Sequence, residues 1–193
     1  MENMDIAKSG EELAKICREN SITLSEYAIL REMEDKDITR EEVVSKMRDI
    51  LETMKSSARE AREREVYSIS GLIGGDAYKM QNYLKSGKSL TGDTMVLAMA
   101  MALSSSEVNA SMGKIVACPT AGSCGILPAA LLSAGERLNA SDDELIKGLF
   151  ASAAIGMIIG RNATFSGAEG GCQAECGSAS AMASAAIVEL MGG

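Results

Sequence analysis

The sequence has 193 residues, which is enough for one well-buried domain or for a domain with a small appendage. Acidic residues outnumber basic ones by 27 to 19 and only 3% of the residues are aromatic, so the composition argues against a nucleic-acid partner. Histidine is absent, which excludes Cys-His and Ser-His nucleophile pairs as well as histidine-ligated zinc.

The sequence shows no apolar signal core at its start, and its longest apolar runs are residues 95–103 and 151–159. Both runs are much shorter than the ~20 residues that cross a bilayer. We therefore expect a soluble, cytoplasmic protein. In that compartment the five cysteines are not expected to form a disulfide framework, which leaves metal binding, catalysis or inert burial.

Residues 1–36 are predicted to form two short helices. The patterns Ser9-x-x-Glu12 and Thr23-x-x-Glu26 are possible capping boxes, in which a hydroxyl and a carboxylate satisfy free backbone groups at a helix start. Cys17 falls among the apolar positions of the first helix, so we interpret it as a plain buried residue.

The pattern Thr39-x-x-Glu42 is predicted to open a long amphipathic helix. Its apolar side chains recur every three or four residues, as they do on one helical face; they are Val43, Met47, Ile50, Met54, Ala58 and Ala61. The charges of residues 59–65 indicate a solvated face or a hinge. The composition changes near residue 66, so we divide the chain into an N-terminal helical segment, 1–65, and a second helical part, 66–193, that together form one continuous domain.

The second part of the chain is also predicted to be helical. Gly71-x-x-Gly74-Gly75 lacks the spacing of a phosphate-binding loop and is interpreted as a turn before a helix. Residues 92–112 are predicted to form a buried helix, followed by helices at 128–138, after Ser141-x-x-Glu144, and at 179–191. Gly156 and Gly160 favour close helix contact. Without strand alternation, the predicted fold class is all-α: a compact helical domain with glycine-rich, cysteine-bearing loops and small-residue helix packing.

Four of the five cysteines fall in two short, glycine-dense segments. Cys118 and Cys124 lie in one loop, whereas Cys172 and Cys176 would share one helical face if the second segment is helical. The spacing matches neither a zinc ribbon nor a ferredoxin, so buried structural thiols and cluster ligation both stay open. Glycine around the cysteines favours ligation, because the backbone must stand close to a bulky cluster.

Three stretches resemble one known family: Cys118-Pro-Thr-Ala-Gly-Ser-Cys124-Gly, Asn162-Ala-Thr-Phe-Ser-Gly-Ala-Glu-Gly-Gly-Cys172-Gln-Ala-Glu, and Ser70-Gly-Leu-x-Gly-Gly-Asp-Ala. They are similar to the iron-sulfur-dependent L-serine dehydratases, α subunit of the two-chain form, over roughly residues 40–193. In this family the α chain continues into a further helical region with a Cys-Asp-Pro motif, so the resemblance implies that this chain lacks the C-terminal part. Cys176 replaces a valine-like residue and is an optional fourth thiolate.

The resemblance implies an L-serine ammonia-lyase, which removes water from L-serine and yields pyruvate and ammonia, a reaction of amino-acid catabolism and gluconeogenesis. It also implies a 4Fe-4S cluster held by Cys118, Cys124 and Cys172. The iron without a protein thiolate would act as a Lewis acid on the substrate. The implied partners are L-serine and the β subunit of the dehydratase, in an oligomer, without nucleic acid or membrane.

Candidate substrate-binding residues flank the proposed ligands; they are Thr120, Ala121, Gly122, Ser166 and Gly167. The first three would equally well only shape the turn. Candidate catalytic residues are Ser123, Lys79 and Glu169. The proton-abstracting base stays open among Lys79, Glu169, a hydroxyl group and a residue of the β subunit. Pyridoxal phosphate is rejected, because no lysine lies in a glycine-rich loop of the required type.

Two interpretations from other classes stay open beside the enzyme. A non-catalytic helical iron-sulfur subunit would bind the cluster but form no pyruvate from L-serine when the β subunit is present. A helical scaffold with buried thiols would stay colourless after anaerobic reconstitution.

Overall fold

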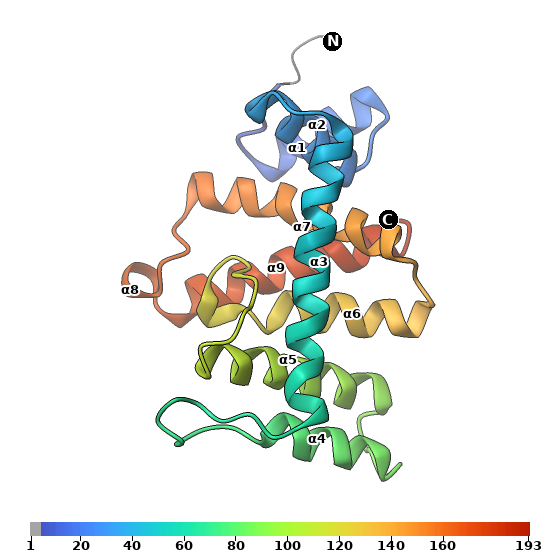
Figure 1. Ribbon diagram of the computed structural model, residues 1–193. Coiled ribbons are helices and arrows are strands. Elements are labelled where there is room, and N and C mark those ends of the chain that lie inside the picture. The colour runs from blue at the N-terminus through green and yellow to red at the C-terminus, as the bar shows by residue number, and fades with distance from the viewer. Residues whose placement is uncertain (1–4) are drawn as a thin grey trace. The chain divides into compact units, whose positions relative to one another are not determined.

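The computed structural model describes residues 5–193, and this range is helical throughout its regular structure (Figure 1). The helices are α1 (Gly10–Asn20), α2 (Leu24–Lys36), α3 (Arg40–Glu63), α4 (Asp76–Lys85), α5 (Asp93–Ala110), η1 (Ala121–Ser123, a 3-10 turn), α6 (Ile126–Leu138), α7 (Asp142–Asn162), α8 (Gly167–Gly170) and α9 (Cys172–Leu190). The one β pairing in the described range is an isolated bridge between Tyr67 and Gly74. The predicted all-α class is thereby confirmed.

The chain divides into two compact units, which are described separately. Unit 1 contains the residues before Ile50 together with Ser141–Gly193, and unit 2 contains Ile50–Ala140. The division falls inside α3, so residues 40–49 belong to unit 1 and residues 50–63 to unit 2. The predicted segments 1–65 and 66–193 follow another criterion, the change in composition, and stay a prediction.

The predicted capping boxes at the starts of α3 and α7 are complete. The Thr39 N–H donates to the Glu42 carboxylate at 2.8 Å and the Ser141 N–H to Glu144 at 2.7 Å, while each hydroxyl accepts the N–H in return. The Thr39 N–H lowers the pKa of Glu42, and the Ser141 hydroxyl lowers the pKa of Glu144. Both caps therefore depend on an ionised carboxylate.

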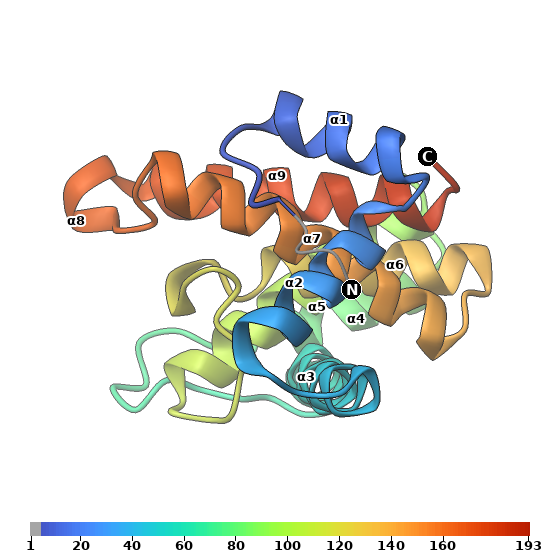
Figure 2. The same cartoon turned by 90° about the horizontal axis from the view of Figure 1, so that it is seen from above.

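In unit 1, α7 packs against α9 and α2 (Figures 1 and 2). The α9 helix buries small residues on one face, and a Cβ placed on Gly156 of α7 would lie 3.1 Å from the Met182 side chain. The prediction that Gly156 permits close helix contact is confirmed. Cys17 is 8% exposed on α1, which confirms that it is a buried residue.

In unit 2, α5 packs between α4 and α6 and also contacts the second part of α3 through a serine. The Ser104 hydroxyl donates to the Ser57 carbonyl at 2.6 Å and accepts the Ala61 N–H at 2.9 Å. Ser57 and Ala61 are one helical turn apart, so the hydroxyl bridges a single step of the α3 backbone ladder. A small apolar cluster beside it contains Ala61, Val66 and Ala77.

The N-terminal half of α5 is less buried than the sequence predicts. Met95 is 54% exposed and Met99 is 42% exposed, and Met99 lines a groove of about 570 Å³ beside Tyr83 and Leu90. The prediction of a buried helix is wrong at this end, because the apolar residues surround the helix and its neighbours cover only part of it.

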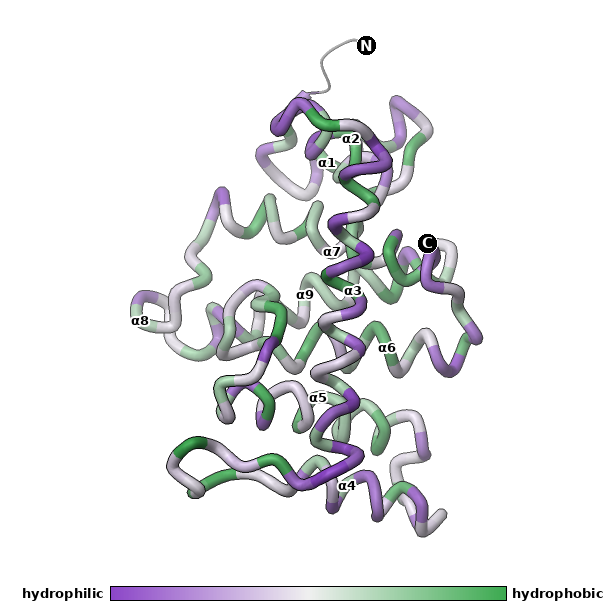
Figure 3. The backbone as a smooth tube through the Cα atoms, viewed as in Figure 1, coloured by the Kyte–Doolittle hydropathy of each residue, from purple (hydrophilic) through white to green (hydrophobic). Residues whose placement is uncertain are grey.

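Hydrophilic residues dominate α3, whereas α7 and α9 are mostly neutral to hydrophobic (Figure 3). None of the helices in the described part of the chain is long and apolar enough to cross a membrane.

Candidate functional site

The first cysteine segment lies in unit 2 and wraps around η1. Cys118 and Cys124 flank this turn and are 5% and 2% exposed. The Cys118 thiol donates weakly to the carbonyls of Val116 and Cys124, at 3.5 and 3.9 Å, and the Cys124 thiol donates to Ser105 of α5 at 3.7 Å. The structure therefore brings these two thiols into one buried place with only weak hydrogen-bond partners.

Burial controls the protonation of this pair. It raises the pKa of the Cys118 thiol to about 12, with a smaller contribution from Cys124, and it raises the pKa of Cys124 as well. Both thiols are protonated at neutral pH, so neither is a reactive nucleophile by itself. A metal or cluster would have to displace both protons on binding.

The turn between the two cysteines is held by its own side chains. The Thr120 and Ser123 hydroxyls lie 3.1 Å apart, and the Thr120 N–H donates to the Ser123 hydroxyl at 3.4 Å. Asn109 of α5 donates to the Ala121 carbonyl at 3.1 Å. Ser123 is buried, Thr120 is half-buried, and Ala121 and Gly122 are exposed. The predicted substrate-binding residues of this segment thus offer an exposed tip on a fixed turn.

Behind the turn, the backbone stands close to α5. A Cβ on Gly125 would lie 2.6 Å from the Ala102 carbonyl oxygen, which is closer than real side chains approach a backbone atom. Glycine at this position is therefore required by a close approach rather than by its backbone dihedrals.

The second cysteine segment lies in unit 1 and is more helical than the predicted loop. Ser166 precedes the short helix α8, Gly171 links it to α9 with φ of 72°, and α9 begins at Cys172 itself. Cys172 and Cys176 therefore lie one turn apart, and their sulfur atoms are 3.6 Å from each other. The conditional prediction of a shared helical face is confirmed. The hydrogen bond with Cys172 raises the pKa of Cys176.

Of the remaining predicted residues of this segment, Ser166 directly precedes α8 and Gly167 and Glu169 lie within it. The Ser166 carbonyl accepts the N–H groups of Glu169 at 3.1 Å and Gly170 at 2.9 Å, and the Glu169 side chain is exposed. A Cβ on Gly167 would lie 2.6 Å from a carboxylate oxygen of Glu175, so Gly167 leaves room for that side chain.

Lys79 lies on the exposed side of α4 in unit 2. Its ammonium group is 2.9 Å from the Asp76 carboxylate, and this hydrogen bond raises the pKa of Lys79. Lys79 is therefore fully protonated at neutral pH.

Glu107 of α5 was missed by the sequence analysis, although it caps the start of α4, directly after the glycine-containing segment. One carboxylate oxygen of Glu107 accepts the Asp76 N–H at 2.7 Å and the Ala77 N–H at 3.1 Å. The side chain is 6% exposed, and its second oxygen is buried without a hydrogen-bond partner in the described residues. The signal that could have found it is an acid far from the start of a predicted buried helix.

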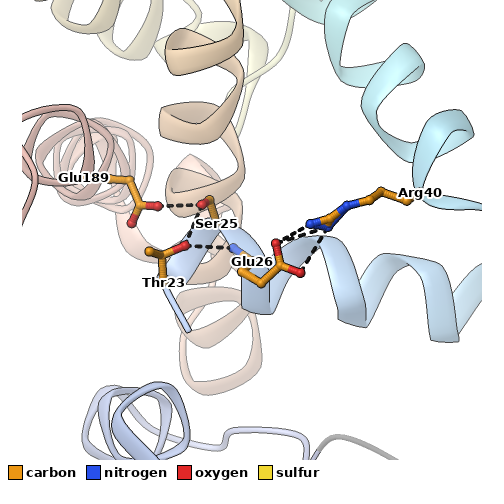
Figure 4. Close-up of polar contacts among 5 residues, drawn as sticks. All are labelled: Thr23, Ser25, Glu26, Arg40 and Glu189. Carbon is orange, nitrogen blue, oxygen red and sulfur yellow. Dashed lines mark hydrogen bonds and ion pairs between the residues drawn. The ribbon is translucent and has the colours of Figure 1, made fainter. Parts of the chain in front are cut away.

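A further polar cluster lines a cavity of about 710 Å³ in unit 1 (Figure 4). Ser25 of α2 donates to Glu189 of α9 at 2.5 Å and lies 2.8 Å from the Thr23 hydroxyl, while Arg40 forms a bidentate pair with Glu26. These contacts hold helices of unit 1 together. No cysteine is among the described residues that line this cavity.

The structure thus brings the cysteines together as two pairs, one in each unit. Within residues 5–193, no group of three or more Cys, Asp or Glu side chains is arranged to hold a metal ion. The three-cysteine ligand set and the assigned roles of the neighbouring residues stay predictions.

The fold and the site together define a class of protein: a helical protein with paired free thiols in glycine-rich segments. Residues 18–193 match the family described as serine dehydratase alpha chain. The chain belongs to this family. It is 45% identical over 185 residues to "L-serine dehydratase, alpha chain" of Peptoniphilus asaccharolyticus, a match that covers 96% of this chain and 63% of that protein.

Two further relatives extend this comparison. "Probable L-serine dehydratase, alpha chain" of Bacillus subtilis (strain 168) is 45% identical over 183 residues, which cover 95% of this chain and 61% of that protein. "L-serine dehydratase" of Streptomyces coelicolor is 32% identical over 193 residues, covering 96% of this chain and 41% of that protein. The chain therefore spans less than two thirds of the length of these relatives.

Proposed function

We propose that this chain carries the iron-sulfur site of an L-serine dehydratase, which dehydrates L-serine to pyruvate and ammonia. The observation that carries the proposal is the family match over residues 18–193, because both cysteine segments lie inside it. The reaction is taken from the printed names of the relatives at 45% identity. The activity of the whole enzyme belongs to the proposal, since the chain spans 63% and 61% of those relatives.

The donor set fits a 4Fe-4S cluster. Cys118, Cys124 and Cys172 are the proposed ligands, and all three are free thiols. Thiolate sulfur is the ligand that such clusters take. The weak hydrogen bonds of Cys118 and Cys124 leave these two sulfur atoms without a strong competing partner.

A bound cluster of this kind supplies one iron without a protein thiolate, which acts as a Lewis acid toward the substrate hydroxyl. Residues of this chain or of the β subunit must then bind the amino acid and move its Cα proton. The proposed substrate contacts fall in the same two segments as the proposed ligands; they are Thr120, Ala121, Gly122, Ser166 and Gly167. The fixed turn around η1 would hold the first three without a change of backbone conformation.

The three proposed catalytic residues suit different tasks. Lys79 is protonated and suits recognition of the substrate carboxylate better than proton abstraction. Ser123 is buried and bonded to Thr120, so it suits support of the turn. Glu169 is an exposed carboxylate, which makes it the candidate for the proton-abstracting base in this chain.

The proposed partner is the β chain of the dehydratase, since two of the relatives are named as alpha chains. An enzyme and a non-catalytic iron-sulfur subunit would both bind the cluster. Only the enzyme would form pyruvate from L-serine when the β chain is present.

Anaerobic reconstitution with iron and sulfide tests the proposal. We expect a brown protein with about four irons per chain, and loss of that colour in Cys124→Ala and Cys172→Ala. Cys17→Ala is the matched control, because Cys17 is a buried thiol outside both segments. The reconstituted chain, mixed with the β chain, should form pyruvate from L-serine. A colourless wild-type chain would reject the cluster, and a brown but inactive mixture would favour the non-catalytic subunit.

A further inference from the structure

Cys172 and Cys176 are unusual among the cysteines of the chain because they lie side by side at an accessible place. Cys172 is the first residue of α9 and Cys176 lies one turn later, and positions four apart share one helical face. Cys172 is exposed and Cys176 half-buried, in contrast to the buried pair in unit 2.

The distance between their sulfur atoms distinguishes two kinds of metal binding. Two thiolates that bind the same tetrahedral ion at ~2.3 Å lie about 3.8 Å from each other. The Cys172 and Cys176 sulfur atoms are 3.6 Å apart, so they match this spacing with almost no movement. In a 4Fe-4S cluster each iron takes one thiolate, and thiolates on separate irons point away from each other and lie much farther apart.

We infer that Cys172 and Cys176 form a two-thiolate site for a single thiophilic divalent ion such as Zn²⁺ or Fe²⁺. The same geometry argues that Cys176, in its present rotamer, is not a fourth ligand of the cluster. No third Cys, Asp or Glu of the described chain completes the site, so water supplies the other ligands. The bound ion is therefore exchangeable rather than structural.

The inference has a consequence that rests on the proposed function. Cys172 is also a proposed ligand of the cluster, and one thiolate cannot serve both sites in full. An ion held by the pair withdraws Cys172, so Zn²⁺ should compete with cluster assembly. Removal of Cys176 should abolish that competition and leave the three proposed cluster ligands intact.

Cobalt is the probe for the first test, on the cluster-free chain of 193 residues, kept reduced without oxygen. Tetrahedral thiolate-bound Co²⁺ absorbs in the near ultraviolet and visible range, and we expect about one cobalt per chain. Cys172→Ser and Cys176→Ser should each lose this absorption, whereas Cys118→Ser and Cys124→Ser should keep it. Helical circular dichroism checks that each variant is folded.

The outcomes separate the two sites. Cobalt absorption that persists in Cys176→Ser would overturn the two-thiolate site. Absorption that is lost in Cys118→Ser or Cys124→Ser would overturn it as well. In the second test, Zn²⁺ present during iron-sulfur reconstitution should reduce iron uptake in the wild type and leave Cys176→Ser unaffected. Equal inhibition of both proteins would overturn the competition. A wild-type chain that takes up no cluster at all would instead reject the proposed function, while the cobalt result would stand by itself.

Discussion

At the scale of single residues, Gly125 shows how little space the cysteine segment of unit 2 leaves. The missing side chain lets the backbone after Cys124 approach the Ala102 carbonyl, at a point where the added Cβ would lie 2.6 Å from that oxygen. Gly177, on α9, is a glycine of a different kind. Nothing lies within 4 Å of its added Cβ.

The two glycines should therefore respond oppositely to alanine. Gly125→Ala forces backbone atoms apart, and we expect it to destabilise the protein by about 1–3 kcal/mol. Gly177→Ala fills open space in a helix interior and should stabilise it by about 0.5–1 kcal/mol. Urea unfolding of both variants measures the difference. Equal effects would contradict the close approach at Gly125.

At the scale of elements, serine hydroxyls join α3 and α5 in unit 2: Ser105 lies 3.4 Å from Ser57, and Ser104 bonds the α3 backbone. Ser104 accepts a backbone N–H from α3 and donates to a carbonyl of the same helical step. Helices bend where a side chain enters their backbone ladder, so this bridge fixes both the distance to α5 and the local geometry of α3.

Ser104→Ala removes the bridge from a fully buried place, and we expect a loss of about 1–3 kcal/mol of unfolding free energy. Ser106→Ala is the matched control on the same helix, because Ser106 is exposed; its effect should stay within about 0.5 kcal/mol. Denaturant unfolding compares the two. If both variants behave alike, Ser57 and Ala61 have closed their ladder directly once the hydroxyl is gone.

The sequence predicts the helices better than their contacts. Hydroxyl-x-x-carboxylate patterns locate the starts of α3 and α7 because capping is a local interaction, satisfied within four residues. The bridge of Ser104 and the cap supplied by Glu107 come from residues more than 25 positions away, so no local pattern reveals them. The i, i+4 spacing of Cys172 and Cys176 is informative only if the segment is helical. The glycines of residues 166–177 favour a loop in the sequence, so the helical start of α9 at Cys172 could not be predicted from them.

At the scale of the whole molecule, the two ionised helix caps contribute stability that depends on pH in one direction. Glu42 and Glu144 have pKa values below the ordinary 4.5 in the folded chain. The unfolded chain therefore binds their protons more readily. Their contribution is present above pH 4.5 and is lost as the pH falls through the lowered values.

The contribution of the caps should accordingly be lost on acidification below pH 4.5, and Glu144→Gln should flatten the decline of stability in that range because the capping side chain no longer titrates. Glu169→Gln is the control, since its exposed side chain caps no helix in the described structure. Thermal unfolding midpoints between neutral pH and about pH 3 measure the slopes. Equal slopes for Glu144→Gln and the wild type would contradict the role of the cap.

The division of the chain also bears on the order in which it folds during synthesis. Unit 2 is one continuous stretch, Ile50–Ala140, whereas unit 1 combines the first 49 residues with the last segment, from Ser141 on. A ribosome delivers the N-terminal residues first, and domains fold as their parts emerge. The α2 helix has to wait for α7, its packing partner, until more than 100 further residues have been made. The middle of the chain is therefore complete while its beginning is still unpaired, which gives a growing chain its longest exposure at α1 and α2.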